Sequence, residues 1–212
     1  IVEVPDKRIK VLQNIVSPEK TQPATVEFVD IAGLVAGASK GEGLGNKFLA
    51  NIRETDAIMH VVRCFNDNNI VHVRDKIDPL SDIGTINTEL ILADMETLDK
   101  AIQKESKKAK SGDKNAINLL EIYKRIEVIF NQGKLAIELN LDSDELNLIR
   151  PLCLITIKPM MYLANVDENG FKDNEILNQL INFSSKNNIP VVPVCAKIES
   201  DISDLKDDEK KI

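Results

Sequence analysis

The sequence predicts an α/β fold, in which a mostly parallel sheet with flanking helices is interrupted by a helical hairpin. Three observations support this prediction. Short apolar runs of strand length recur along the chain, segments with helical patterning lie between them, and a stretch in the middle of the chain has no strand candidate at all. Alternation of strands and helices is typical of a parallel, doubly wound sheet.

Strand candidates are short apolar runs that end where turn-forming or polar residues begin. The run 58–62 is almost continuously apolar, which predicts a strand buried on both faces of the sheet. The helical candidates between the strands have apolar residues on one face. The predicted strands are 1–4, 25–29, 57–65, 160–164 and 191–194, and the predicted helices between them are 6–15, 46–53 and 174–186.

The middle of the chain predicts two long helices joined by a turn. Apolar residues recur at three- and four-residue steps in two series, and the sequence Ser111-Gly112-Asp113 between the series favours a turn. The first arm, of about 28 residues, would be ~40 Å long at the rise of an α-helix, so we expect it to project from the core. The resulting domain prediction is a core part at 1–79, a coiled-coil-like hairpin insertion at 80–150 and a second core part at 151–212.

Composition limits the class of protein. The chain has 212 residues, of which 43% are hydrophobic and 29% charged, which suits one sizeable core, or one core with an insertion. No apolar run has the length needed to span a bilayer, so no membrane association is expected. Cys64, Cys153 and Cys195 lack the spacing of metal ligands, and His60 and His72 are the only histidines. We therefore expect a cytoplasmic protein with reduced cysteines and no histidine-based zinc site.

One segment has the pattern of a nucleotide-sensing loop. An apolar run ends in Asp30-Ile31-Ala32-Gly33, and a glycine-rich loop and a helix-like segment follow. In P-loop nucleotidases this arrangement holds magnesium and senses a γ-phosphate. Asp30 would then hold a magnesium-bound water, and the main chain of Gly33 would approach the phosphate. The four residues alone also fit a strand followed by an ordinary turn.

The longer string is more specific. Residues 30–49, followed by Arg53-Glu54-Thr55-Asp56, resemble the switch region of the YchF or Obg-like ATPases, an Obg-related branch of the translation-factor-class P-loop proteins. The resemblance extends over essentially the whole chain. It implies a P-loop NTPase-type fold, hydrolysis of ATP with Mg²⁺, association with the ribosome or ribosomal RNA, and a role as a translation or stress-response regulator.

A second nucleotide element is expected after the strand at 160–164. Most GTPases of this class read guanine there with Asn-Lys-x-Asp, whereas this chain has Asn165-Val166-Asp167-Glu168. Val166 replaces the lysine and the longer Glu168 replaces the last aspartate, so the site lacks its usual means of rejecting adenine. The same departure is found in the YchF-like pattern, and it favours ATP over GTP. Without that resemblance, an Asx-type turn after a strand explains Asn165 equally well.

A third element follows the strand at 191–194. Cys195-Ala196-Lys197 resembles the short Ser-Ala-Lys-like loop whose main chain contacts the base. We therefore expect Asn165, Val166 and Glu168 from one loop and Cys195, Ala196 and Lys197 from the other to form the base site.

Two expected parts of a nucleotidase are missing from the sequence. No Gly-x-x-x-x-Gly-Lys-Ser/Thr occurs, so in a YchF-like protein the phosphate-binding loop and the magnesium-ligating threonine would precede Ile1, and a β-rich TGS domain would follow Ile212. Leu34 occupies the position where many relatives have a water-orienting glutamine, and no catalytic residue can be named. We expect this chain alone to be incompetent in hydrolysis, and hydrolysis by the parent to be slow unless a partner positions the water.

The turn end of the predicted hairpin is basic. Six lysines and two acids lie between Lys100 and Lys114, a local charge of +4 in a chain of net charge −7. This pattern fits either a solvated face or a surface that binds RNA phosphates without reading sequence. The residues proposed for contact with the ribosome are Lys104, Lys107, Lys108, Lys110 and Lys114.

Two other functions remain open. An Obg-like GTPase with relaxed base specificity would have the same motifs, and a non-enzymatic module could bind RNA or protein through the hairpin while the core serves as a scaffold. A dinucleotide-binding oxidoreductase is excluded, because residues 41–45 lack the Gly-x-Gly-x-x-Gly spacing.

Overall fold

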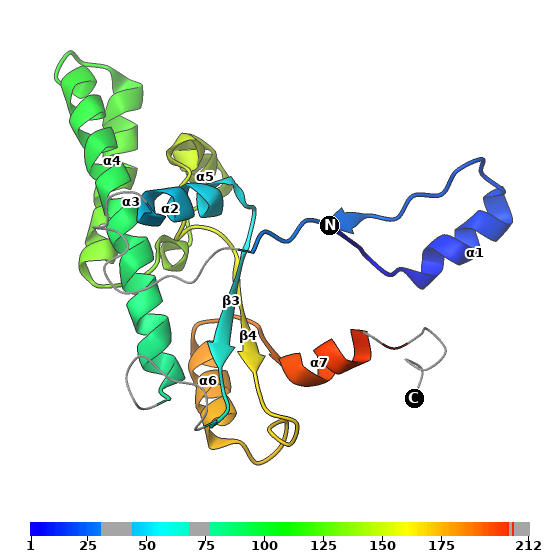
Figure 1. Cartoon of the computed structure of the whole chain (residues 1–212). Coiled ribbons are helices and arrows are strands. Elements are labelled where there is room, and N and C mark those ends of the chain that lie inside the picture. Colours follow the sequence, from blue (N-terminus) through cyan, green and yellow to red (C-terminus); the bar gives the residue numbers. More distant parts are fainter. Residues whose placement is uncertain (31–43, 68–76, 204, 206–212) are drawn as a thin grey trace. The chain divides into compact units, whose positions relative to one another are not determined.

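The computed structural model describes residues 1–30, 44–67, 77–203 and 205 (Figure 1). The chain forms two compact units, Ile1–Gly33 and Leu34–Ile212.

The first unit is a short helix between two paired strands. Strand β1 (Val2–Glu3) pairs antiparallel with β2 (Thr25–Val26), and helix α1 (Lys7–Val16) lies between them in sequence. The carboxylate of Asp6 accepts a hydrogen bond from the Arg8 amide at 2.9 Å and so caps the start of α1. Both strands lie where they were predicted, but they are shorter than expected and pair with each other rather than in a parallel ladder.

The second unit contains a parallel three-stranded sheet, as predicted. Its strands are β3 (Ile58–Arg63), β4 (Met160–Asn165) and β5 (Val191–Val194), in the order β3-β4-β5. The register places Arg63 beside Asn165 and Asn165 beside Val194. All three strands therefore end at the same edge of the sheet. The loops that follow them meet at this edge.

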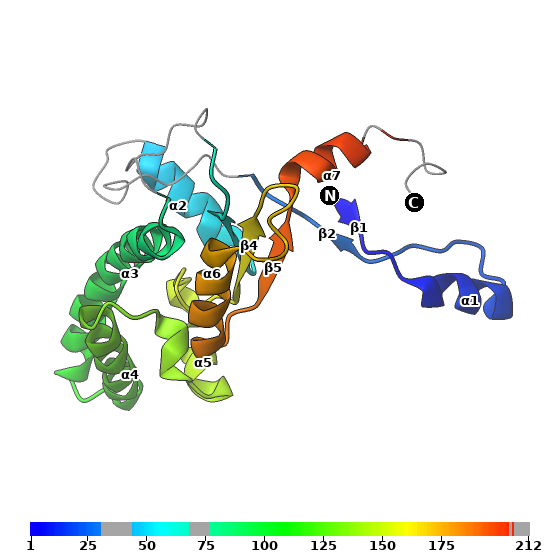
Figure 2. The same ribbon diagram turned by 90° about the horizontal axis from the view of Figure 1, so that it is seen from below.

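Helices cover the sheet on the face of Val62, Tyr162 and Ala164, which are each at most 2% exposed. Helix α6 (Glu175–Lys186) connects β4 to β5 and packs on this face, and α7 (Ala196–Ser203) follows β5 (Figure 2). The expectation that β3 would be buried on both faces is wrong for the described residues, because Met59 and Val61 point away from this cluster and are 40% and 60% exposed.

The predicted helical hairpin is confirmed. Helix α3 (Pro79–Ala109) and helix α4 (Lys114–Asn131) are joined by a tight turn in which Gly112 has a φ of 87°. Asp78 caps the start of α3 through the Ser81 amide, and Asp113 caps α4 through the amides of Asn115 and Ala116. The first arm has 31 residues, slightly more than predicted. Its turn end lies away from the sheet (Figure 1).

The base of the hairpin is packed into the protein. Ile83 of α3 is buried together with Val62 and Tyr162 of the sheet. Farther along, α3 and α4 share a second core, in which Leu98 and Ile126 are almost fully buried. Three short helices absent from our sequence prediction complete this region: η2 (Ala136–Leu139), α5 (Ser143–Ile149) and η3 (Arg150–Leu152).

Candidate functional site

The loops after β4 and β5 are joined by main-chain and side-chain hydrogen bonds. The side-chain oxygen of Asn165 accepts a hydrogen bond from the Ala196 amide at 3.1 Å, across a sequence separation of 31 residues. One residue later, the Val166 amide donates to the Val194 carbonyl at 2.9 Å. The two elements predicted to bind the base are therefore neighbours in the structure.

An ion pair also connects the two loops. The Lys197 ammonium lies 2.6 Å from a Glu168 carboxylate oxygen, and both side chains are well exposed. The hydrogen bond with Glu168 raises the pKa of Lys197. Glu168, the acid predicted to replace the guanine-reading aspartate, is thus paired with a cation from the opposite loop.

Two of the predicted site residues are buried. Val166 and Cys195 are each 2% exposed and belong to the core between the sheet, α3 and α6. Any contact that either residue makes with a bound nucleotide must therefore come from its main chain. Burial raises the pKa of another core cysteine, Cys64, to about 11, so its thiol stays protonated at neutral pH.

Asn174 fixes the loop after β4, and our sequence analysis did not select it. Its side-chain oxygen accepts from the Leu177 amide and caps α6, while its side-chain nitrogen donates to the carbonyls of Cys64 at 2.9 Å and Gly170 at 3.1 Å. This residue therefore connects the end of β3 to the loop that carries Glu168. Asn174 was predicted as the first residue of the helix 174–186, and an asparagine at a helix start was the available signal, because asparagine is a preferred helix cap.

The predicted switch residues are only partly within the described structure. Asp30 is exposed at the end of the first unit. One exposed carboxylate is compatible with holding Mg²⁺ through a water molecule, since magnesium keeps several waters in protein sites. Gly33 and Leu34 lie outside the described residues.

A buried charged cluster lies between α2 (Leu44–Glu54), α3 and the segment that enters β4. The carboxylate of Asp94 on α3 is fully buried and accepts hydrogen bonds from Ile155 and Thr156. It also pairs with Arg53 of α2 at 3.3 Å. Burial raises the pKa of Asp94, and the hydrogen bonds and the Arg53 charge act against that rise. Arg53 was expected only as part of the switch motif, and Asp94 was not among the predicted site residues.

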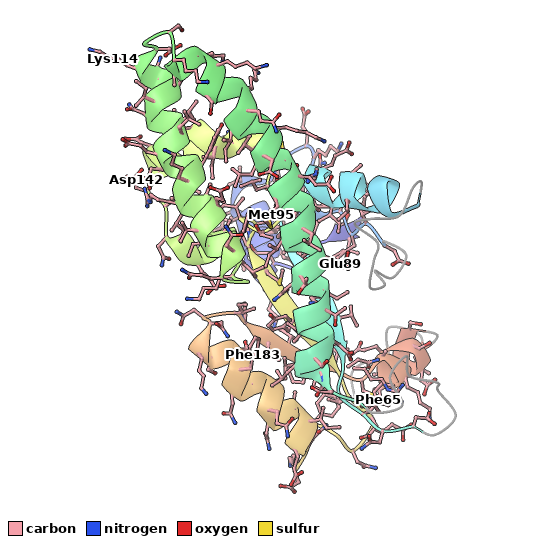
Figure 3. The ribbon with its side chains drawn as sticks, turned by 90° about the vertical axis from the view of Figure 1, so that its left-hand side faces the viewer. Phe65, Glu89, Met95, Lys114, Asp142 and Phe183 are labelled. Atoms are coloured by element: carbon pink, nitrogen blue, oxygen red, sulfur yellow. The ribbon has the colours of Figure 1, made fainter. Side chains whose placement is uncertain are left out.

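The five lysines proposed for ribosome contact are all exposed around the turn end of the hairpin. Figure 3 shows Lys114 at this end, with Glu89 and Met95 farther down α3. Lys108 pairs with Glu105 at 2.8 Å, which neutralises part of the positive charge. The structure thus presents a basic tip on a pair of helices that share a core.

Other classes of site find no support in the part of the chain that the structure describes. No group of three or more His, Cys, Asp and Glu side chains there is arranged to hold a metal ion. Its three cysteines are free thiols. None of the described helices has both the length and the apolar character needed to cross a membrane.

The parallel sheet, the flanking helices and the two joined loops at the carboxyl edge define a P-loop GTPase-like α/β protein. The model of the 50S ribosome-binding GTPase family matches residues 7–132, and the chain belongs to this family.

Relatives are similar over nearly the whole chain. The chain is 54% identical over 210 residues to a protein of Haemophilus influenzae named "Ribosome-binding ATPase YchF", covering 99% of this chain and 58% of that protein. Its identity to the Bacillus subtilis protein of the same name is 49% over 215 residues, covering 100% and 59%.

A solved structure, described as the Schizosaccharomyces pombe YchF GTPase, superposes with a TM-score of 0.79 at 31% identity, covering 99% of this chain and 58% of that one. The predicted resemblance to the YchF or Obg-like ATPases and the predicted fold class are confirmed. The chain spans a little under three fifths of the length of these proteins.

Proposed function

We propose that this chain is part of a ribosome-associated nucleoside triphosphatase that binds and hydrolyses ATP in preference to GTP and acts as a translation or stress-response regulator in the cytoplasm. The main support for this proposal is the hydrogen bond between Asn165 and Ala196, which joins the loops at the ends of β4 and β5. The names of the relatives, which call them ribosome-binding ATPases, support both the activity and the partner.

The positions of Val166 and Glu168 favour ATP over GTP. The side chain of Val166 is in the core, and the Glu168 carboxylate is paired with Lys197. To accept the two donors on the edge of guanine, the Glu168 carboxylate would have to share or give up its pairing with Lys197. Adenine presents one donor beside an acceptor, so a site without that carboxylate loses little by accepting it.

Magnesium would be held through Asp30 and a bound water, and the Gly33 main chain would approach the γ-phosphate. When bound, the ion neutralises charge that develops on the phosphates. Leu34 has no group that can orient a water molecule. Hydrolysis by the parent would therefore be slow without a partner.

Titration of the full-length parent with fluorescent ATP and GTP analogues, with Mg²⁺ present, tests the base assignment. We expect tighter binding of ATP. Glu168→Asp shortens the side chain and should weaken the pairing with Lys197, so this variant should shift the preference toward GTP. Lys186→Ala, at an exposed lysine at the end of α6 and outside the two joined loops, serves as the control. A clear preference of the unmodified parent for GTP would contradict the ATP assignment and favour an Obg-like GTPase.

The ribosome contact is proposed for the basic tip, through Lys104, Lys107, Lys108, Lys110 and Lys114. Cosedimentation with ribosomes at several salt concentrations tests it. A Lys107→Glu, Lys110→Glu variant should bind several-fold more weakly and depend less on salt, because fewer counterions are released. A Lys172→Glu, Lys186→Glu variant is the matched control, since both lysines are exposed and lie outside the hairpin. Equal losses in the two variants would show that total charge, and not the tip, governs binding.

A non-enzymatic module that binds RNA through the same tip is the second candidate. It is favoured by the exposed lysines alone. If the full-length parent binds ribosomes but hydrolyses neither nucleotide, with or without ribosomes, this candidate replaces the enzyme.

A further inference from the structure

The C-terminal half of α2 is held firmly between the core and the hairpin. This helix directly follows residues 31–43, the segment of the predicted switch loop. Leu49 and Ile52 are 7% and 6% exposed, so one face of the helix is packed. Among the described side chains, this attachment includes the end of the helix that is farther in sequence from the switch segment.

Arg53 contacts both the first helix of the hairpin and the segment that follows the insertion. Its guanidinium donates to the Ala93 carbonyl at 3.1 Å and the Thr97 hydroxyl at 3.0 Å on α3, and it pairs with Asp94. It also donates to the Cys153 carbonyl at 2.9 Å, on the segment that returns from the hairpin toward β4. One side chain of α2 thus joins the outgoing and returning segments of the insertion.

Lys158 holds the same end of α2 from the other side. Its ammonium donates to the carbonyls of Ile52 and Arg53, each at 2.7 Å, and to the carbonyl of Thr55. A cation at a helix C-terminus satisfies carbonyls that have no partner within the helix and interacts favourably with the helix dipole. The last turn of α2 is therefore fixed to the residues that lead into β4.

We propose that Arg53 and Asp94 couple α2 to the hairpin, so that a change in the segment before α2 is transmitted to α3. In this arrangement Arg53 is a positioning residue, and the hairpin with its basic tip is the part that responds. The proposed function supplies the source of the change, because the switch segment would sense the γ-phosphate. The coupling itself is a property of the described residues and can be tested without nucleotide.

The two helices are coupled because separating Arg53 from its partners on α3 would cost free energy. Asp94 is fully buried, and the folded protein is strongly destabilised when a buried carboxylate loses the cation that pairs with it. The planar guanidinium of Arg53 makes several directed hydrogen bonds at once, and a lysine cannot reproduce that fork. Movement of α2 that kept α3 in place would break these contacts together, so the two helices are expected to move as a unit.

Amide hydrogen exchange in this chain, without nucleotide, tests the coupling. Ala50→Gly loosens α2 at an exposed position, which should raise exchange of α2 amides by about fivefold through helix propensity alone. With Arg53 and Asp94 intact, exchange of amides 90–98 on α3 should rise by a similar factor. In an Arg53→Gln, Asp94→Asn background, the same Ala50→Gly change should leave these α3 amides unaffected.

Two controls keep the test decisive. Amides of α6 report general destabilisation and should not respond to Ala50→Gly in either background. If the double variant does not fold, Arg53→Lys replaces it and should reduce the α3 response at least twofold. An α3 response of equal size with and without the Arg53–Asp94 pair, or no response in the unmodified background, would overturn the proposal. Loss of nucleotide binding by the parent would contradict the proposed function but would leave this result unchanged.

Discussion

The side-chain oxygen of Asn165 lies 3.1 Å from the amide nitrogen of Ala196 and accepts its hydrogen bond, joining the loops after β4 and β5. Asn165→Ala should lower the free energy of unfolding by about 1 kcal/mol, because this bond is lost. Asn165→Asp is the control, since it keeps an oxygen acceptor at the same position. Urea unfolding of both variants is the measurement, and equal losses would show that the bond is not the cause.

Removal of the Asp94 carboxylate should destabilise the protein strongly. Asp94→Ala leaves the Arg53 cation and the amides of Ile155 and Thr156 without their partner in a buried site, which should cost about 3–5 kcal/mol. Asp99→Ala changes an exposed aspartate on the same helix and should cost less than about 0.5 kcal/mol. Similar midpoints for the two variants in chemical unfolding would contradict the importance assigned to the Asp94 cluster.

Position 170 has little room for a side chain, whereas position 84 has ample room. A Cβ on Gly170 would lie 2.8 Å from the Asp167 carboxylate oxygen and 3.0 Å from the Val166 Cβ, whereas a Cβ on Gly84 of α3 would meet nothing within 4 Å. Gly170→Ala should therefore destabilise the protein by about 1–3 kcal/mol. Gly84→Ala should stabilise it by up to about 1 kcal/mol through helix propensity. In thermal unfolding, the midpoint of the Gly170→Ala variant should fall and that of the Gly84→Ala variant should rise. Shifts of the same sign would be inconsistent with these contacts.

His60 should make the protein sensitive to mild acid. Burial lowers the pKa of this residue on β3 from 6.5 to about 4, and the charge of Asp82 acts in the opposite direction. The unfolded chain therefore takes up a proton near pH 6.5 while the folded chain does not, and stability falls as the pH drops from about 6.5 to 4. The loss should reach at most about 3 kcal/mol.

His60→Gln removes the titrating group and is the variant for comparison. The difference in unfolding free energy between the unmodified chain and this variant should be constant above pH 7 and change steadily below pH 6.5. A difference that stays constant down to pH 4 would show that His60 titrates normally in the folded protein.

Much of the fold was predictable because its signals are local. Strands β3, β4 and β5 are short apolar runs, and their ends were predicted to within about two residues. The turn at Gly112 and the two long helices followed from apolar spacing and from a glycine between two periodic series. The pairing of β1 with β2 was not predicted, because both antiparallel and parallel partners are compatible with such short apolar segments. The three short helices after α4 were missed because they are brief and their packing against the hairpin is a tertiary effect.

The sequence by itself determined the family, the order of the elements and the identity of the loops at Asn165 and Ala196, since these depend on residue types at fixed spacings. Only the tertiary structure decided that Glu168 is paired with Lys197, that the side chain of Val166 is in the core, and that Arg53 reaches Asp94 on the hairpin. Such pairings join residues far apart in the chain, and no local pattern encodes them. They arise from the strand register and from helix packing, which are set by burial over the whole unit.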